Sequence, residues 1–249
     1  MKEWITGRNP VYETLQAGRR QFFRLQIAEG VAEKGRLDEI LTLSRMANIP
    51  VERVPRKQLE SLDAGHQGVA LQVSGYRYCD LIDILEGASR HQEPPLVLIL
   101  DTLQDPQNLG TLLRTAEIVG VHGVLLPYRR TATVTPAVVS ASSGASEHLL
   151  INQTNLAQAI EVLKEEGIWV IGLDSGSEAQ VPDKVRLDGA LALVVGNEGE
   201  GMRRLVRESC DLLMRLPMRG EIDSLNAAVA GSVALYLAWQ ARNFAGRLG

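Results

Sequence analysis

Two short apolar runs constrain the fold of this chain more than any other feature. Leu96–Leu100 reads Leu-Val-Leu-Ile-Leu, residues 190–195 read Ala-Leu-Ala-Leu-Val-Val, and neither run contains a polar residue. A strand that alternates polar and apolar residues can leave one face in water, whereas a continuously apolar strand must be covered on both faces. We therefore expect an α/β protein, with a parallel sheet buried between helices.

Strand and helix patterns alternate throughout the second part of the sequence, which is typical of a doubly wound sheet. The expected strands are 96–100, 123–126, 147–151, 168–173, 190–195 and 212–216. The expected helices are 109–119, 136–141, 155–166, 202–208 and 224–243. Ligands of such sheets bind beyond the carboxyl ends of the strands, so the loops that follow the strands are the candidate sites.

The first 75 residues form a smaller α/β pattern of their own. Strands are expected at 22–28, 50–54 and 68–73, and helices at 10–17, 35–47 and 56–62. The stretch 76–95 contains a short helical pattern, followed by a polar segment that ends in a Pro-Pro pair, and this composition favours a linker. We therefore predict an N-terminal domain of residues 1–75, a linker of residues 76–95 and a C-terminal domain of residues 96–249.

Composition argues against several classes of protein. The longest nearly apolar stretch, 227–239, is too short to span a bilayer, and no hydrophobic run of the signal-peptide type opens the chain. We therefore expect a cytoplasmic protein without a membrane association. Cys79, Cys210 and the four histidines show no metal-ligand spacing, so neither a metal site nor a disulfide is expected.

The charge distribution does not by itself indicate a nucleic-acid-binding protein. The net charge is −4, with +2 in residues 1–75 and −6 in the remainder. A polyanion would have to be held by local clusters of cationic residues, which are more often solvated surface. The clusters are Arg19, Arg20 and Arg24; Arg56 and Lys57; Arg129 and Arg130; and Arg203, Arg204 and Arg207.

Three loops at expected strand ends carry the chemical information. The first begins at Asp101 and enters a helix near Asn108, with Arg114 further along that helix. A helix N-terminus beside a guanidinium can bind an anion, but a capping Asn108 and a surface Arg114 explain this segment equally well.

The second loop, Gly196-Asn-Glu-Gly-Glu-Gly201, allows close approach of the backbone to a ligand. It lacks the phosphate-binding patterns, and its glutamates would repel a pyrophosphate, so an uncharged or cationic ligand is favoured. The third segment runs from Leu216 to Ala230, where Asp223 or Ser224 can cap the last helix. Taken alone, Ser224 and Asn226 are explained as capping and turn residues. No Gly-x-Ser-x-Gly occurs, which excludes a serine-hydrolase elbow.

Together the loops resemble the three signature motifs of the SpoU ribose methyltransferases of the SPOUT superfamily. They read Asp-Pro-x-Asn-x-Gly-x-x-x-Arg-Thr-Ala, Gly-Asn-Glu-Gly-Glu-Gly and Leu-Pro-Met…Ser-Leu-Asn, and they match in order and strand-end placement across 96–243. Residues 1–75, through Gly7-x-x-x-Val11 and the turn at 66–69, resemble the family's substrate-binding domain. This layout most resembles the branch that methylates a guanosine 2′-oxygen in the large-subunit P-loop of 23S rRNA. Ala228 departs from the serine common in the third motif.

The resemblance implies a small N-terminal substrate-binding domain and a C-terminal parallel-sheet methylase domain with a deep trefoil knot. It implies that S-adenosylmethionine is held largely by backbone groups of Gly196, Leu216 and Leu225, with Met218 nearby. The implied reaction is in-line transfer of the methyl group to a ribose 2′-hydroxyl, without metal or covalent intermediate.

The resemblance also assigns catalytic roles. Arg114 is the key residue, as general base or as electrostatic stabiliser. Because a guanidinium gives up its proton only at high cost, electrostatic stabilisation is at least as plausible as the general-base role. Asn108 would orient Arg114 or the ribose, and Glu198 would hold Arg114 or the target nucleotide. Ser224 and Asn226 would complete the pocket.

The expected partners are structured 23S rRNA, or a precursor of the large ribosomal subunit, and a second copy of the chain. The RNA contacts would be Arg8, His66 and Gln67, and the final helix, apolar nearly all round, would form a homodimer unless one subunit buries it entirely. Two other classes compete. A dinucleotide-dependent oxidoreductase is suggested only by the alternating strands and glycine loop, and a catalytically silent RNA-binding or ribosome-assembly protein would keep the fold without the reaction.

Overall fold

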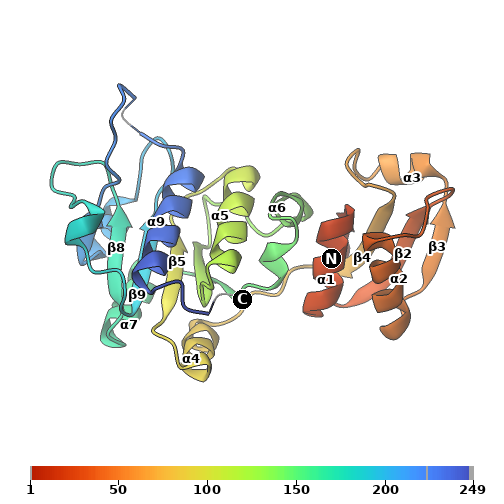
Figure 1. The fold of residues 1–249 in the computed structure, drawn as a ribbon, viewed down its shortest axis with the longest axis horizontal. Coiled ribbons are helices and arrows are strands. Elements are labelled where there is room, and N and C mark those ends of the chain that lie inside the picture. Colours follow the sequence, from red (N-terminus) through yellow and green to blue (C-terminus); the bar gives the residue numbers. More distant parts are fainter. Residues whose placement is uncertain (1, 223, 247–249) are drawn as a thin grey trace. The chain divides into compact units, whose positions relative to one another are not determined.

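The computed structural model describes residues 2–222 and 224–246, which divide into two compact units (Figure 1). The first unit combines the residues up to Arg77 with Thr133–His148. The second combines Tyr78–Ala132 with the described residues from Leu149 onward. Among the described residues, no helix is long and apolar enough to cross a membrane.

The second unit contains a parallel six-stranded sheet with the order β10-β8-β9-β5-β6-β7. Its strands are β5 (Leu96–Leu100), β6 (Gly123–Pro127), β7 (Ile151–Thr154), β8 (Trp169–Leu173), β9 (Leu191–Val195) and β10 (Leu212–Met214). Every residue of β5 and β9 is buried, as the two apolar runs predict, and so is every residue of β6. The expected parallel sheet is therefore confirmed.

Helices cover both faces of this sheet (Figure 1). They are α4 (Leu81–His91), α5 (Pro106–Ile118), α7 (Leu156–Glu165), α8 (Arg204–Ser209) and α9 (Ala227–Ala241). α5 and α9 pack together over one face, while α4, α7 and α8 share the hydrophobic core of the other. At Gly231 of α9, an added Cβ would lie 2.6 Å from Leu112 Cδ2 of α5, so a larger residue there would force the Leu112 side chain to move.

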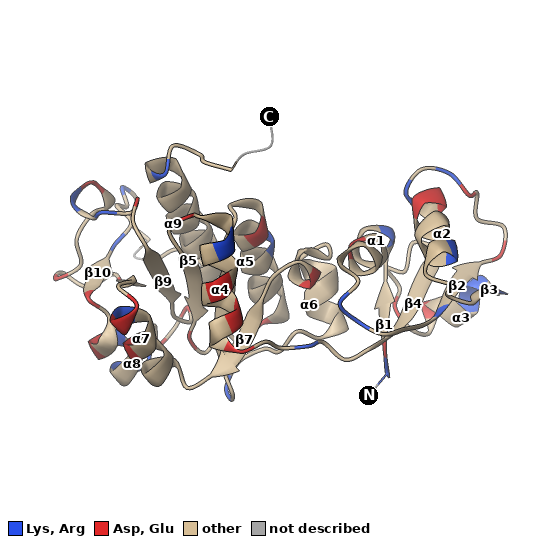
Figure 2. Cartoon of the chain, turned by 90° about the horizontal axis from the view of Figure 1, so that it is seen from below, with Lys and Arg blue, Asp and Glu red and all other residues tan. Residues whose placement is uncertain are grey.

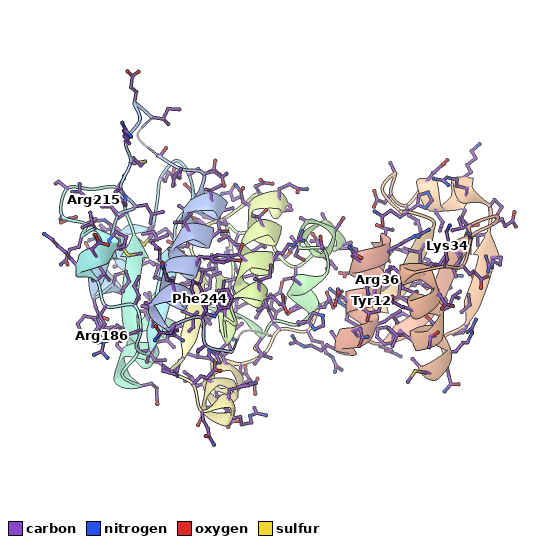
Figure 3. All side chains as sticks on the ribbon, in the orientation of Figure 1. Tyr12, Lys34, Arg36, Arg186, Arg215 and Phe244 are labelled. Atoms are coloured by element: carbon purple, nitrogen blue, oxygen red, sulfur yellow. The ribbon has the colours of Figure 1, made fainter. Side chains whose placement is uncertain are left out.

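The first unit contains a four-stranded sheet with the order β1-β4-β2-β3. The strands are β1 (Lys2–Thr6), β2 (Phe22–Ala28), β3 (Val51–Val54) and β4 (Val69–Ser74), and the helices are α1 (Arg8–Ala17), α2 (Arg36–Met46) and α3 (Arg56–Glu60). The sequence did not predict β1, whose only apolar residues are Trp4 and Ile5. Pairing with β4 forms this strand and buries Ile5 completely. Arg36 of α2 stacks on the ring of Tyr12 of α1, with its guanidinium carbon 4.0 Å from the ring centroid (Figure 3).

The segment between β6 and β7 differs most from the prediction. A strand was expected at 147–151, but β7 begins at Ile151, and the preceding residues form α6 (Pro136–Ala141) and the 3₁₀ turn Ala145–Glu147 within the first unit. The cause is Glu147, whose carboxylate accepts from Arg20 Nη2 at 2.7 Å and from Nε at 2.9 Å. Both side chains are 1% exposed. This buried pair binds the segment to the first unit, so it does not extend β7 in the sheet of the second unit.

The segment 76–95, expected to be a linker, contains α4. Asp80 and Asp83 form a capping box at its start, and Ile84 is fully buried in the core of the second unit. An added Cβ at Gly123 of β6 would overlap the side chain of Ile84, so the strand and this helix are closely packed.

We predict that Glu147→Ala lowers the free energy of unfolding by about 3–5 kcal/mol, because it leaves the Arg20 guanidinium buried without its bidentate partner. Urea titration followed by circular dichroism measures the change. Glu39→Ala, which removes an exposed pair with Arg36, is the control and should cost no more than about 0.5 kcal/mol. Equal shifts for the two variants would contradict the prediction.

Candidate functional site

A cavity of about 600 Å³ lies at the carboxyl ends of three strands in the second unit. The last residues of β8, β9 and β10, namely Leu173, Val195 and Met214, form its floor. The remaining lining consists of Asp174, Ser175, Val181, residues 196–201, residues 215–218, Ser224, Leu225, Ala227 and Ala230. The second and third sequence loops therefore meet around one cavity, at the sheet edge where ligands of parallel sheets bind.

The glycine loop is closed on itself. Asn197 and Gly201 exchange backbone hydrogen bonds of 3.1 and 3.2 Å, and Asn197 Oδ1 accepts from the backbone N–H groups of Gly199 and Glu200. An added Cβ at Gly196 would overlap the backbone of Gly201, so only glycine permits this closure. The backbone of the loop is consequently held against the cavity.

A buried carboxylate fixes the chain just beyond this loop. Asp101, fully buried after β5, accepts from the backbone N–H of Arg203 and from its Nε, both at 2.7 Å. The sequence patterns did not single out this pair. Its signal was an acidic residue directly after a continuously apolar strand, where a carboxylate can remain buried only if it is paired.

A second carboxylate, Asp174, lines the cavity at the end of β8. It accepts from Arg207 Nε at 2.8 Å and from the backbone N–H of Gly176 at 2.7 Å. Burial alone would raise the pKa of Asp174, but these hydrogen bonds and the Arg207 charge outweigh it, so the pKa lies below its ordinary value. Asp174 is therefore charged at neutral pH. With Glu198 and Glu200 it gives the cavity three carboxylates against one cation, Arg215, and this excess of negative charge favours a cationic ligand.

Three predicted catalytic residues meet beside the cavity. The amide of Asn226 donates to Asn108 Oδ1 at 3.1 Å and also to Glu198 Oε1. The amide of Asn108 donates to the same Glu198 oxygen at 2.7 Å. One residue from each of the three sequence loops thus contributes to a single hydrogen-bonded group.

The capping geometry explains how Asn226 is oriented. Its Oδ1 accepts from the backbone N–H groups of Ala228 and Val229, so Asn226 is the N-cap of α9. The amide nitrogen then points toward Asn108 and Glu198. The expectation that Ser224 caps this helix is wrong, because α9 begins at Ala227 and Ser224 lines the cavity instead. The alternative cap, Asp223, lies outside the described residues.

Asn108 and Arg114 both lie on α5. Asp105 caps this helix by accepting from the backbone N–H of Gln107, which leaves the Asn108 side chain for Glu198. Arg114 is exposed and lies six residues after Asn108, about 9 Å along the helix axis.

The remaining predicted site residues fall into two groups. Gly196, Leu216, Met218 and Leu225, the candidate cofactor residues, all line the cavity. Arg8, His66 and Gln67 lie in the first unit.

Within that second group, Arg8 donates from its backbone N–H to Gln67 Oε1 and from its Nε to Gln67 O, at 2.9 and 3.3 Å. His66 is 1% exposed and accepts from the N–H of Gly68, so it holds the turn instead of facing a ligand.

Comparison with known proteins identifies both parts of the chain. Residues 95–236 match the model of the SpoU rRNA Methylase family, and residues 4–79 match the model named RNA 2′-O ribose methyltransferase substrate binding. A Bacillus subtilis protein named as a TrmH family tRNA/rRNA methyltransferase is 43% identical over 97% of this chain and 96% of its own length.

Solved structures agree in fold. The SpoU methyltransferase AviRb from Streptomyces viridochromogenes, solved with AdoMet, has a TM-score of 0.81 and 22% identity over 98% of this chain and 91% of that chain. An AdoMet-bound rRNA methyltransferase from Sinorhizobium meliloti has a TM-score of 0.78 and 22% identity, covering 96% and 87% of the two chains.

The Asp101–Arg203 pair generates a testable prediction. Asp101→Asn keeps the shape of the side chain, but its amide has one acceptor oxygen for the two N–H donors of Arg203. The free energy of unfolding should therefore fall by about 1.5–3 kcal/mol. Thermal and urea unfolding measure this change. Asp188→Asn, which alters a solvent-exposed pair with Arg186, is the matched control and should leave the unfolding curve unchanged. A wild-type unfolding curve for Asp101→Asn would contradict the structural role of this carboxylate.

Proposed function

The chain belongs to the SpoU rRNA methylase family, and we propose that it transfers a methyl group from S-adenosylmethionine to the 2′-hydroxyl of a guanosine in 23S rRNA. The observation that carries this proposal is the hydrogen-bonded group of Asn108, Glu198 and Asn226 beside a cavity at strand ends. This arrangement joins a nucleotide-positioning group to a ligand pocket.

The cavity fits S-adenosylmethionine, the cofactor of this family. Its volume of about 600 Å³ suits a ligand of this size. Backbone groups of Gly196 and Leu216 can bind the adenine edge, Leu225 and Met218 can cover its faces, and the nearby carboxylates favour a positive charge. When bound, S-adenosylmethionine supplies a methyl group activated by a sulfonium. We also propose that the second and third motif loops form the trefoil knot that the resemblance implies.

The chain's residues would act by positioning and by charge. The Asn108–Glu198–Asn226 group is exposed enough to bind the target nucleotide and fixes its orientation. Arg114 contributes a cationic guanidinium group, which is a poor general base. We therefore assign it the stabilisation of negative charge that develops on the ribose 2′-oxygen.

Substrate selection is proposed to belong to the first unit. The matched region 4–79 supports this role, and Arg8 with Gln67 offers a cation and an amide at one turn. A structured hairpin of 23S rRNA, free or in a large-subunit precursor, would be recognised by its shape and splayed bases. This substrate also implies a cytoplasmic location.

The substrate can be tested directly. The protein should incorporate methyl groups into unmodified 23S rRNA transcripts but not into tRNA transcripts, and mapping of 2′-O-methyl groups should identify one guanosine. Incorporation into tRNA alone would contradict the rRNA assignment. Binding of S-adenosylhomocysteine without incorporation into any RNA would favour a silent RNA-binding protein.

We predict that Arg114→Ala abolishes methylation while the affinity for S-adenosylhomocysteine stays within a few-fold, because Arg114 lies outside the cavity lining. Single-turnover rates and calorimetry measure the two quantities. Arg114→Lys keeps the charge but loses the planar donor fork, so it should also be severely impaired. A rate near wild type for Arg114→Lys would reduce the role to that of a point charge.

The role of the first unit is best tested with point substitutions. Deleting residues 1–75 would leave Glu147 without Arg20 and uncover α6, so loss of activity could reflect misfolding. We predict that Arg8→Ala combined with Gln67→Ala raises KM for 23S rRNA about tenfold at unchanged kcat. Steady-state kinetics measure this split, with Lys34→Ala as a surface control. An unchanged KM would remove Arg8 and Gln67 from the RNA interface.

The methylase unit is proposed to form a homodimer through α9. This helix contains no Asp, Glu, Lys or Arg (Figure 2), and Val229, Val233 and Tyr236 remain 47%, 41% and 45% exposed on one face. Such an apolar stripe is unfavourable in water unless another surface covers it.

Val233→Glu should therefore convert a dimer to a monomer, because a charge at the centre of the stripe would be buried without a partner. Light scattering at micromolar concentration measures the mass. Glu117→Lys, an exposed change on α5, serves as the control. A monomeric wild-type protein would refute this assembly.

A further inference from the structure

The structure distinguishes between the four cationic clusters of the sequence. Arg20 is buried with Glu147, Arg24 pairs with Glu52, and Arg56 pairs with Glu60. In the cluster that follows the glycine loop, Arg203, Arg204 and Arg207 each pair with a carboxylate. Within the described part of the chain, neither Arg129 nor Arg130 forms an ion pair, whereas each of the other three clusters has at least one paired arginine.

These two arginines follow an exposed aromatic residue at a strand end. All residues of β6 are buried, and the next residue, Tyr128, is 68% exposed, with Arg129 and Arg130 exposed after it. An exposed tyrosine beside two cations suits RNA, because its ring can stack on a base while guanidinium groups bind phosphates.

The segment 128–130 is anchored to the loop that leads to the catalytic group. Leu103 O, between β5 and α5, accepts from Thr131 Oγ1 at 3.0 Å and from the N–H of Ala132 at 2.6 Å. The loop that contains Leu103 enters α5, where Asn108 meets Glu198 and Asn226. Segment 128–130 is thereby held at the same carboxyl edge of the sheet as the catalytic group.

The backbone of this segment adds a further indication. Arg130 has φ of +59°, in the left-handed region that glycine adopts most easily. A long cationic side chain at such a position is kept against a conformational cost, which is a common feature of functional loops.

We propose that segment 128–130 binds the nucleotides that flank the methylated ribose: Tyr128 stacks on an unpaired base, and Arg129 and Arg130 bind neighbouring phosphates. Positive charge is needed there because Glu198 and Glu200 border the cavity and repel the RNA backbone. This inference rests on the proposed function, since it presumes that RNA reaches the catalytic group.

The role of Tyr128 is tested in the full-length protein with transcribed 23S rRNA. Tyr128→Ala should lower kcat/KM about tenfold, because one base stack is removed, whereas Tyr128→Phe should keep it near wild type. S-adenosylhomocysteine affinity, measured by calorimetry, should not change in either variant. Trp169→Ala, a comparably exposed aromatic residue at the amino end of β8, is the matched control and should behave as wild type.

The role of the arginines is tested by the salt dependence of RNA binding. Replacing both Arg129 and Arg130 with Ala should reduce the slope of log affinity against log salt by about 0.7 for each phosphate that the variant no longer binds. The control is Arg186→Ala, which should keep the wild-type slope. Arg186 lies at the opposite edge of the sheet from Arg215, which lines the cavity (Figure 3). An unchanged slope for the double variant would contradict phosphate binding by these arginines.

Ultraviolet cross-linking separates failure of this inference from failure of the proposed function, because its readout does not need methyl transfer. We expect an RNA adduct on the peptide that contains Tyr128. An adduct there without methylation of any RNA would overturn the proposed reaction but support the binding segment. Active protein with a wild-type kcat/KM for Tyr128→Ala, or with adducts only on other peptides, would overturn the inference alone.

Discussion

The buried carboxylate of Asp101 is the constraint on which the methylase unit depends. A charged group at the end of an apolar strand is tolerated only when its oxygens are occupied, and Arg203 occupies both with its backbone N–H and its guanidinium. This fixes the chain after the glycine loop, so residues 196–201 must turn back over the end of β9. That turn places Glu198 where its carboxylate accepts hydrogen bonds from both Asn108 and Asn226.

Helix capping performs a second task at this site. Asn226 uses its oxygen to satisfy the free N–H groups at the start of α9 and its nitrogen to reach the other two loops. A hydroxyl-bearing cap would satisfy the helix but would lack an amide that can donate two hydrogen bonds. The choice of asparagine therefore reflects both the stability of the helix and the geometry of the site.

The sequence was sufficient to predict the parallel sheet, because β5 and β9 are apolar on both faces, and to locate the site at strand ends. It did not reveal β1, which gains its burial only by pairing with β4, or the departure of residues 133–148 from the sheet. That departure depends on a pair between Arg20 and Glu147, 127 residues apart, and no local pattern reports such a contact. The buried state of His66 and the pairing of Asp101 were hidden for the same reason. By contrast, Asn108, Glu198 and Asn226, which the structure brings together, each lie in a short local motif.

The division of the chain into units has a consequence for how such proteins diversify. The backbone passes from one unit to the other after Arg77, after Ala132 and after His148. Residues 1–77 therefore do not constitute a self-sufficient cassette, because their fold is completed by a helix encoded within the methylase half. Recombination that exchanged only the front of the gene would separate Arg20 from Glu147. Because both side chains are buried, the two segments must be inherited together for this pair to form.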